Sequence, residues 1–233
     1  MNLYNAIIEF SRRYDDLQKT SGYEPLSIMA TGGAMSISAL GIVPGASARL
    51  AGTCHPYSMT ELFDFVKPAL SAVQAKKGES EWHSVHGESA LSYLKALVLR
   101  SPSNRFFVAS TAALETTRRR RGENVSYVAM QRTAAGPISL WKIVFTKWEE
   151  YLQKTKYPKM TLPEVWDKTY KKEDGSINLE ALWDTRSIED EKMTRAILAL
   201  ILDDPKFAHL DAGDKIIRLS FPVIREEMVW AGK

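Results

Sequence analysis

The sequence predicts an α/β fold: a layered sandwich with a mixed sheet, followed by a helical C-terminal extension. Three observations support this class. Short apolar runs typical of strands alternate with segments of helical spacing in the first half of the chain. A turn at Ala135-Gly136-Pro137 separates two strand-like runs with no helix between them, which indicates a hairpin and an antiparallel edge. After Lys147 the chain becomes rich in aromatic and charged residues, so we expect a domain over 1–146 and a helical extension over 147–233.

The N-terminal half is expected to alternate helices with short extended segments. Apolar side chains recur every three or four residues at its start, which is typical of a helix with one buried face. Ser58 and Glu61 match a capping box, which marks a helix start. The expected elements are a helix over 2–19, a strand over Leu26–Ala30, a short helix over Ala34–Leu40, an extended segment over 52–57 and a helix from Met59 to about Val73.

The remaining elements are predicted in the same way. Three strands are expected over Arg105–Thr111, Val125–Arg132 and Ile138–Phe145, after a helix around Leu91–Val98. In the extension, Ser187 is the expected N-cap of a helix that ends before Pro205. A further helical segment is expected to begin near Asp214.

Composition excludes several classes of protein. Apolar residues make up 45% and charged residues 25% of the 233 residues, as in soluble globular proteins. The net charge of +3 gives no reason to expect nucleic acid or a membrane as partner. The single cysteine, Cys54, excludes an intramolecular disulfide, and no stretch is apolar enough for a signal region or a membrane span. We therefore expect a cytoplasmic protein.

A glycine turn is the clearest candidate for a binding element. The apolar strand Leu26–Ala30 leads into Thr31-Gly32-Gly33 and then into the expected short helix. Such a turn presents backbone N–H groups and the positive end of a helix dipole to an anion. The spacing matches neither the dinucleotide-binding fingerprint nor a P-loop, so the turn alone does not identify a ligand.

Four segments in this order resemble the C-terminal domain of the CinA family, which has the nicotinamide mononucleotide (NMN) amidohydrolase fold. The resemblance covers about residues 3–146 and is greatest to a divergent branch, which includes the CinA-like domain joined to nucleotidyltransferase-like domains in plants. The segments are Thr31-Gly32-Gly33, Val43-Pro44-Gly45-Ala46-Ser47, Tyr57-Ser58, and Ser110–Leu114 with the basic run that follows it.

The resemblance implies a chemistry that this chain lacks the residues to perform. The family hydrolyses the amide of NMN with a serine nucleophile activated by a lysine and a tyrosine. Here the serine position is Met29 and the lysine position is Leu62, and only Tyr57 is retained. A thioether cannot attack and leucine cannot act as a base, so the family's deamidation is not expected to operate.

What remains resembles a binding site for a pyridine nucleotide or a related nucleotide metabolite. The family match also implies a homo-oligomer, and no cofactor or metal is expected. The ligand-binding residues that the resemblance implies are Thr31, Gly32, Gly33, Ser47, Tyr57, Thr111, Arg118 and Arg121.

Two other functions stay open. One is an amidohydrolase that uses rearranged catalytic residues; the other is a structural or interaction protein with a vestigial pocket, acting through residues 147–233. Cys54 and His55 are neighbours on an extended segment, so their side chains face opposite ways and do not suit a catalytic pair. His83 and His86 lack further clustered ligands, so they do not indicate a metal site.

Overall fold

A single mixed sheet organises the molecule. The computed structural model describes residues 2–70, 85–101, 105–119, 122–220 and 225–231, and within these ranges seven strands pair in the order β2-β1-β3-β4-β5-β6-β7. The strands are β1 (Leu26–Thr31), β2 (Leu50–Cys54), β3 (Phe106–Ala113), β4 (Asn124–Gln131), β5 (Ile138–Phe145), β6 (Lys215–Ser220) and β7 (Arg225–Ala231).

The sheet is parallel at one side and antiparallel at the other. β1 pairs in parallel with both β2 and β3, and every later pair from β3–β4 to β6–β7 is antiparallel. The predicted hairpin is present as β4–β5, with Val128 opposite Trp141. The predicted α/β class with a mixed sheet is therefore confirmed.

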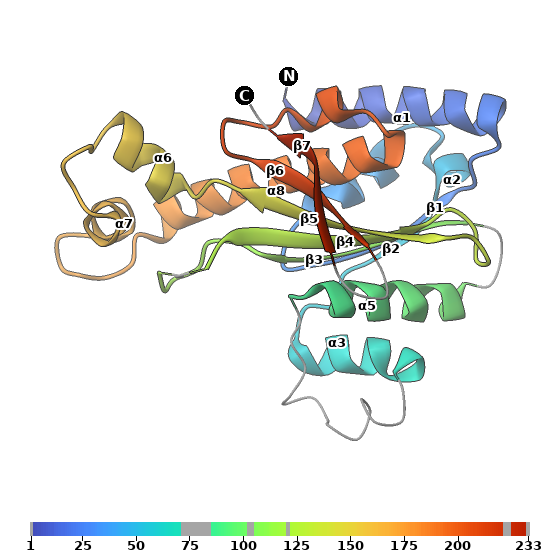
Figure 1. Ribbon diagram of the computed structural model, residues 1–233, viewed down its shortest axis with the longest axis horizontal. Coiled ribbons are helices and arrows are strands. Elements are labelled where there is room, and N and C mark those ends of the chain that lie inside the picture. The colour runs from blue at the N-terminus through green and yellow to red at the C-terminus, as the bar shows by residue number, and fades with distance from the viewer. Residues whose placement is uncertain (1, 71–84, 102–104, 120–121, 221–224, 232–233) are drawn as a thin grey trace.

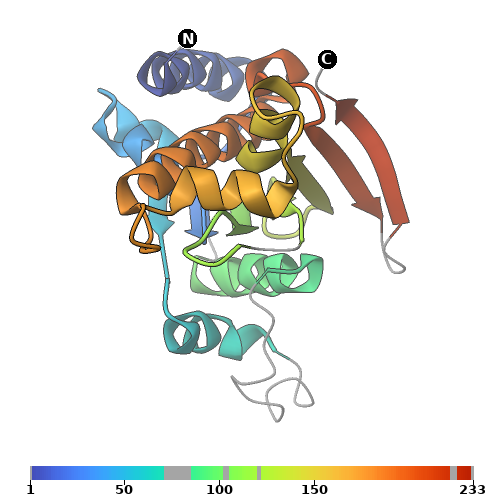
Figure 2. The same cartoon turned by 90° about the vertical axis from the view of Figure 1, so that its left-hand side faces the viewer.

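Helices cover both faces of this sheet, which makes a three-layered sandwich (Figure 1). The helices α1 and α8 lie over one face, and α3 and α5 lie over the other (Figures 1 and 2). The helices are α1 (Leu3–Ser21), α2 (Ala46–Arg49), α3 (Met59–Val66), α5 (Gly87–Arg100), α6 (Trp148–Thr155), α7 (Leu162–Tyr170) and α8 (Leu179–Leu202). The short 3-10 helices are η1 (Met35–Ile42), η2 (Lys67–Ala69) and η4 (Pro205–Ala208).

Each face of the sheet has its own apolar core. Phe10 of α1, Ile37 of η1 and Ile197 of α8 are fully buried in the first core. Met29 of β1 and Leu94 of α5 are fully buried in the second. Because β1 alternates its side chains between the two faces, neighbouring residues of this strand contribute to both cores.

The capping box of α3 is confirmed, but the helix is shorter than expected. The Ser58 hydroxyl accepts from the Glu61 N–H at 3.1 Å, and the Glu61 carboxylate accepts from the Ser58 N–H at 3.3 Å. The helix ends at Val66 and η2 follows, with Pro68 in its first turn. Residues 71–73 of the predicted helix lie outside the described residues.

Two predictions for the C-terminal part are wrong. Ser187 is not an N-cap: α8 begins nine positions earlier, where the Asn178 side chain accepts from the Ala181 N–H, and the Ser187 hydroxyl donates to the Trp183 carbonyl within the helix. No helix begins near Asp214. Its carboxylate accepts from the Thr146 N–H at 2.9 Å, and the strand β6 starts at the next residue.

The expectation that residues 147–233 are helical is correct only as far as η4. Beyond it, β6 pairs with β5 and buries Ile216, and β7 continues the sheet. The second half of α8 belongs to the same core cluster as α1 and β1. Among the described residues, no helix combines the length and apolar character needed to cross a membrane.

Candidate functional site

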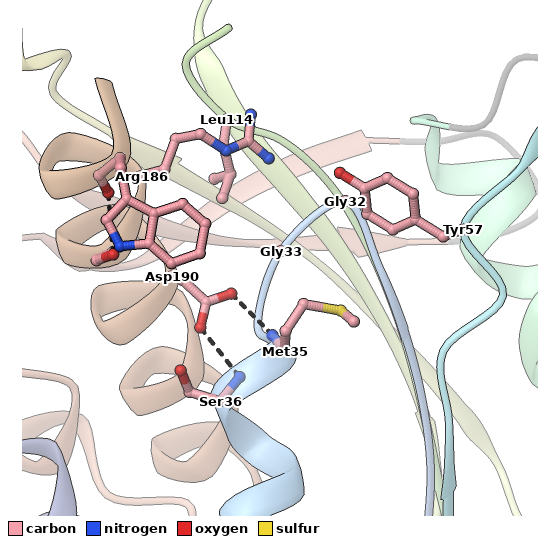
Figure 3. A pocket seen from close by; sticks show the side chains of 10 residues that line it. Gly32, Gly33, Met35, Ser36, Tyr57, Leu114, Arg186 and Asp190 are labelled. Carbon is pink, nitrogen blue, oxygen red and sulfur yellow. Dashed lines mark hydrogen bonds between the residues drawn. The ribbon is translucent and has the colours of Figure 1, made fainter. Parts of the chain in front are cut away.

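A pocket of about 390 Å³ lies where β1 ends, between the glycine turn and one side of α8 (Figure 3). The walls come from four places in the chain: the turn with the start of η1, the segment before α3, the end of β3, and the first half of α8. The lining residues are Gly32, Gly33, Met35, Ser36, Tyr57, Leu114, Trp183, Arg186, Ser187 and Asp190. The carboxyl end of a parallel strand is the usual place for a ligand in an open α/β sheet.

Packing alone requires Gly32 and leaves little room for a side chain at Gly33. Gly32 has φ +75°, and a Cβ added there would lie 2.1 Å from the Ala112 carbonyl oxygen. A Cβ on Gly33 would lie 2.9 Å from the Met193 sulfur of α8. The glycine turn therefore has a structural cause whether or not a ligand binds.

The backbone N–H groups after the turn already have an anionic partner. The Asp190 carboxylate accepts from the Met35 N–H at 2.8 Å through Oδ1 and from the Ser36 N–H at 3.0 Å through Oδ2 (Figure 3). Ala34, at the N-cap position of η1, has no side chain that can accept a hydrogen bond. Asp190, from α8, therefore caps the start of η1 in place of Ala34. Its carboxylate accepts from the same N–H groups that a phosphate at this helix start would use.

A second contact fixes α8 against the end of β3. The Arg186 guanidinium donates to the Glu115 backbone carbonyl, and the Glu115 N–H donates to the Glu189 carboxylate at 2.8 Å. The Glu115 carboxylate accepts from the Trp166 indole N–H at 3.2 Å. These bonds hold the wall of the pocket that carries Arg186 and Asp190.

The two positions where the resemblance places the family's serine and lysine are apolar and buried. Met29 and Leu62 belong to the same core cluster, on the face of the sheet covered by α3 and α5. Cys54 packs against that cluster, and burial raises the pKa of its thiol, which disfavours the nucleophilic thiolate. Tyr57 lines the pocket, and the described lining contains no lysine.

The structure brings together three of the predicted ligand residues. Gly32, Gly33 and Tyr57 line the pocket. Thr31 and Thr111 are buried opposite one another on β1 and β3, and Ser47 is exposed on α2. Arg118 is exposed, and its carbonyl accepts from the Thr116 hydroxyl at 2.7 Å. These last four residues do not line the pocket, and Arg121 lies outside the described residues.

The histidines considered from sequence have local partners. The Nε2 atom of His55 lies 2.5 Å from the Ser38 hydroxyl, and its Nδ1 atom lies 3.2 Å from the Ala30 carbonyl oxygen. His86 caps α5 by accepting from the Glu88 N–H at 3.3 Å, and His83 is outside the described residues. The described part of the chain contains no group of three or more acidic, histidine or cysteine side chains placed to hold a metal ion.

Sequence reasoning missed the α8 wall of the pocket. Trp183, Arg186 and Asp190 recur at spacings of three and four, so they lie on one face of the helix. That pattern was available in the sequence, but the expected helix start at Ser187 divided it. Placing the N-cap at Asn178 joins the three residues into one polar and aromatic stripe.

This chain is an α/β sandwich, with helices on both faces of a mixed sheet and a pocket at the end of β1. Its fold is that of the CinA, or competence/damage-inducible, superfamily. The chain is similar to the competence or damage-inducible protein from Enterobacter asburiae, with 10% identity and a TM-score of 0.53 over 84% of this chain and 96% of that one.

Two further solved structures agree. The competence damage-inducible protein A from Klebsiella pneumoniae matches with 11% identity and a TM-score of 0.53, over 87% of this chain and 96% of that one. A CinA superfamily protein from Enterobacter cloacae matches with 10% identity and a TM-score of 0.51, over 89% of this chain and 93% of that one. These shares exceed residues 1–146, so the likeness extends into the C-terminal part. No family model and no curated protein matches the sequence.

Proposed function

We propose that this chain binds a pyridine nucleotide or a related nucleotide-type metabolite in the pocket beside α8, without the Ser/Lys amide hydrolysis of the CinA family. The observation that supports it most is the pocket itself. Its volume of about 390 Å³ is in the range of small-molecule sites, and the glycine turn and Tyr57 both line it. Both features carried the family resemblance in the sequence.

Two aromatic rings supply the binding surface. Tyr57 is 62% exposed and Trp183 is 72% exposed, although both line the pocket. Large aromatic side chains gain free energy when a planar ring covers them, because apolar area leaves water and the rings stack. A heteroaromatic base is the ligand group that suits these two residues.

The loss of chemistry follows from what replaces the catalytic pair. Met29 and Leu62 fill one apolar cluster, so no serine or ammonium group reaches the pocket from these positions. A tyrosine alone is a weak nucleophile at neutral pH because its pKa is near 10. A binding role therefore fits these residues better than hydrolysis.

Isothermal titration calorimetry with NMN, NAD and ADP-ribose tests this proposal. We expect binding by the unaltered chain and a loss of roughly tenfold or more in affinity in Tyr57→Ala and Trp183→Ala. Tyr151→Ala is the matched control, because Tyr151 is an exposed aromatic residue outside the pocket lining. Arg118→Ala tests the sequence-based assignment separately. If neither these three ligands nor the corresponding nucleoside, nicotinamide riboside, binds, the pocket is vestigial and the proposal is wrong.

One observation favours the amidohydrolase as a second candidate. The Ser38 hydroxyl lies 2.5 Å from His55 Nε2, which is a serine beside a base that a backbone carbonyl orients. Ser38 does not line the pocket, so binding remains the first proposal. Ammonia release from NMN above a no-protein control, abolished in Ser38→Ala, would establish this second function.

A further inference from the structure

The pocket has a balanced pair of charges rather than a basic lining. Among its lining residues only Arg186 and Asp190 carry a charge at neutral pH, and the two are one helical turn apart on α8. The Arg186 guanidinium already donates to the Glu115 carbonyl. A phosphate monoester, which carries −1.5 to −2 charges at neutral pH, would meet one partly engaged cation and one carboxylate.

Asp190 also stands where such an anion would bind. Each of its two oxygens accepts from one backbone N–H group, those of Met35 and Ser36, at 2.8 and 3.0 Å. Two phosphate oxygens at a helix N-terminus would use the same pair of donors. The carboxylate therefore occupies the N-terminus of η1 as an internal anion.

The helix α8 is fixed on both sides of Asp190, so the Asp190 carboxylate cannot easily move away from η1. Three and seven positions after Asp190, the buried residues Met193 and Ile197 fix α8 in the core that also contains Ile37 of η1. Four residues before it, Arg186 ties the same helix to the end of β3. An incoming phosphate would have to displace a carboxylate held by two charge-assisted hydrogen bonds on a fixed helix.

We propose that Asp190 determines ligand specificity: it excludes a phosphate from the glycine turn, so the pocket takes a heteroaromatic nucleoside in preference to its 5′-phosphate. This inference rests on the proposed function and narrows its ligand class. The N-glycosylated pyridinium ring of nicotinamide riboside carries a positive charge. The carboxylate attracts that charge, and Tyr57 and Trp183 offer aromatic faces for the ring.

The experiment compares two matched ligands and one simple anion. Nicotinamide riboside, NMN and inorganic phosphate are titrated by calorimetry into the full chain and into three variants. Asp190→Ala frees the two N–H groups, and Asp190→Asn removes the charge while keeping the size. Asp184→Ala is the control, because Asp184 is an exposed carboxylate of the same helix outside the pocket lining. Circular dichroism establishes that each variant is folded.

We expect the unaltered chain and Asp184→Ala to bind the riboside roughly tenfold or more tightly than NMN. In Asp190→Ala and Asp190→Asn this preference is expected to shrink or invert, and Asp190→Ala is expected to gain binding of inorganic phosphate. An equal or tighter affinity of the unaltered chain for NMN overturns the inference, as does an unchanged preference in both Asp190 variants.

Failure of the proposed function gives a different result. If neither the riboside nor NMN binds to any form of the protein, the proposed function is wrong. The titration with inorganic phosphate then tests by itself whether Asp190 acts as an internal anion. Binding by Asp190→Ala but not by the unaltered chain supports that role, and no binding by either overturns it.

Discussion

At the scale of single residues, the glycine turn shows how a motif can have two causes. Sequence reasoning assigned Gly32 and Gly33 to phosphate binding. In the structure, Gly32 is needed because any Cβ would collide with the Ala112 carbonyl oxygen. The N–H groups after the turn, those of Met35 and Ser36, already donate to Asp190. The turn shapes one wall of the pocket, and packing explains Gly32 fully and Gly33 in part.

Gly32→Ala is expected to destabilise the protein by more than about 3 kcal/mol, because a backbone group at 2.1 Å must move in addition to the cost of the positive φ. Gly175→Ala is the control. Gly175 also has a positive φ, but nothing lies within 4 Å of an added Cβ, so its cost is expected to be about 1–2 kcal/mol. Chemical denaturation measures both values, and equal costs would contradict the packing explanation.

Two glutamates are expected to make opposite contributions to the pH dependence of the free energy of unfolding. Burial raises the pKa of Glu149 although Arg119 lies 3.0 Å away, so its contribution to stability is lost as pH rises through the folded-state pKa. The N–H groups of Tyr57 and Ser58 lower the pKa of Glu61, so its contribution is lost as pH falls through the folded-state pKa.

Denaturation at several pH values between 3 and 8, a span about the usual pKa of glutamate, checks these signs. Relative to the unaltered chain, Glu149→Gln is expected to become more stable as pH rises, since glutamine does not ionise. Glu61→Gln is expected to become relatively less stable over the same rise. The same slope for both variants would contradict the assignment.

At the scale of elements, α8 has two roles along its 24 residues. Its first half carries Trp183, Arg186 and Asp190 into the pocket, and its second half is buried almost continuously. One helix therefore links the wall of the pocket to the core. This division also explains why the helix start was predicted at Ser187 and not at Asn178. The first half of α8 is mostly polar, so it lacks the apolar stripe from which a helix is predicted.

The two halves of α8 are expected to respond differently to truncation. Ile197→Ala removes a fully buried side chain and is expected to cost about 2–5 kcal/mol of stability. Trp183→Ala removes a side chain that is mostly exposed and is expected to change stability by less than about 0.5 kcal/mol, while weakening ligand binding. Thermal unfolding and calorimetry separate these effects, and a large loss of stability in Trp183→Ala would contradict the two-role description.

Elements with a strong periodic pattern were predicted well from the sequence. Residues 2–19 and the hairpin at Gly136 have such patterns, and both were placed within a few residues of their observed bounds. The strand β6 was missed because its partner β5 is more than 70 positions away in the chain, and Asp214 before it resembled a helix start. The pocket residues of α8 were missed since their role depends on tertiary packing against the glycine turn.

At the scale of the whole molecule, the C-terminal part completes the core. α8 covers one face of the sheet beside α1 (Figure 2). Ile216 of β6 is fully buried, and its strand pairs with β5. Deleting residues 147–233 removes the α8 and β6 side chains from the cluster that contains Ile28 and Val108, so we expect these two residues to become exposed. A chain of residues 1–146 is therefore expected to lose cooperative thermal unfolding and near-UV dichroism. A sharp transition in that fragment would show that the first part folds alone.

Self-association is a separate expectation, because it comes from the family resemblance. We expect the full chain to elute as a homo-oligomer in size-exclusion chromatography with light scattering. A mass of 26.2 kDa at every concentration would identify a monomer and contradict this expectation.

Native mass spectrometry of the purified full chain tests the central claim most directly. The account expects a complex with a nicotinamide nucleoside or nucleotide, either co-purified or formed on addition, that is lost in Tyr57→Ala and Trp183→Ala but retained in Tyr151→Ala. A chain that carries no small molecule and ignores added nicotinamide riboside, NMN, NAD and ADP-ribose would contradict the claim that this pocket binds a ligand of that class.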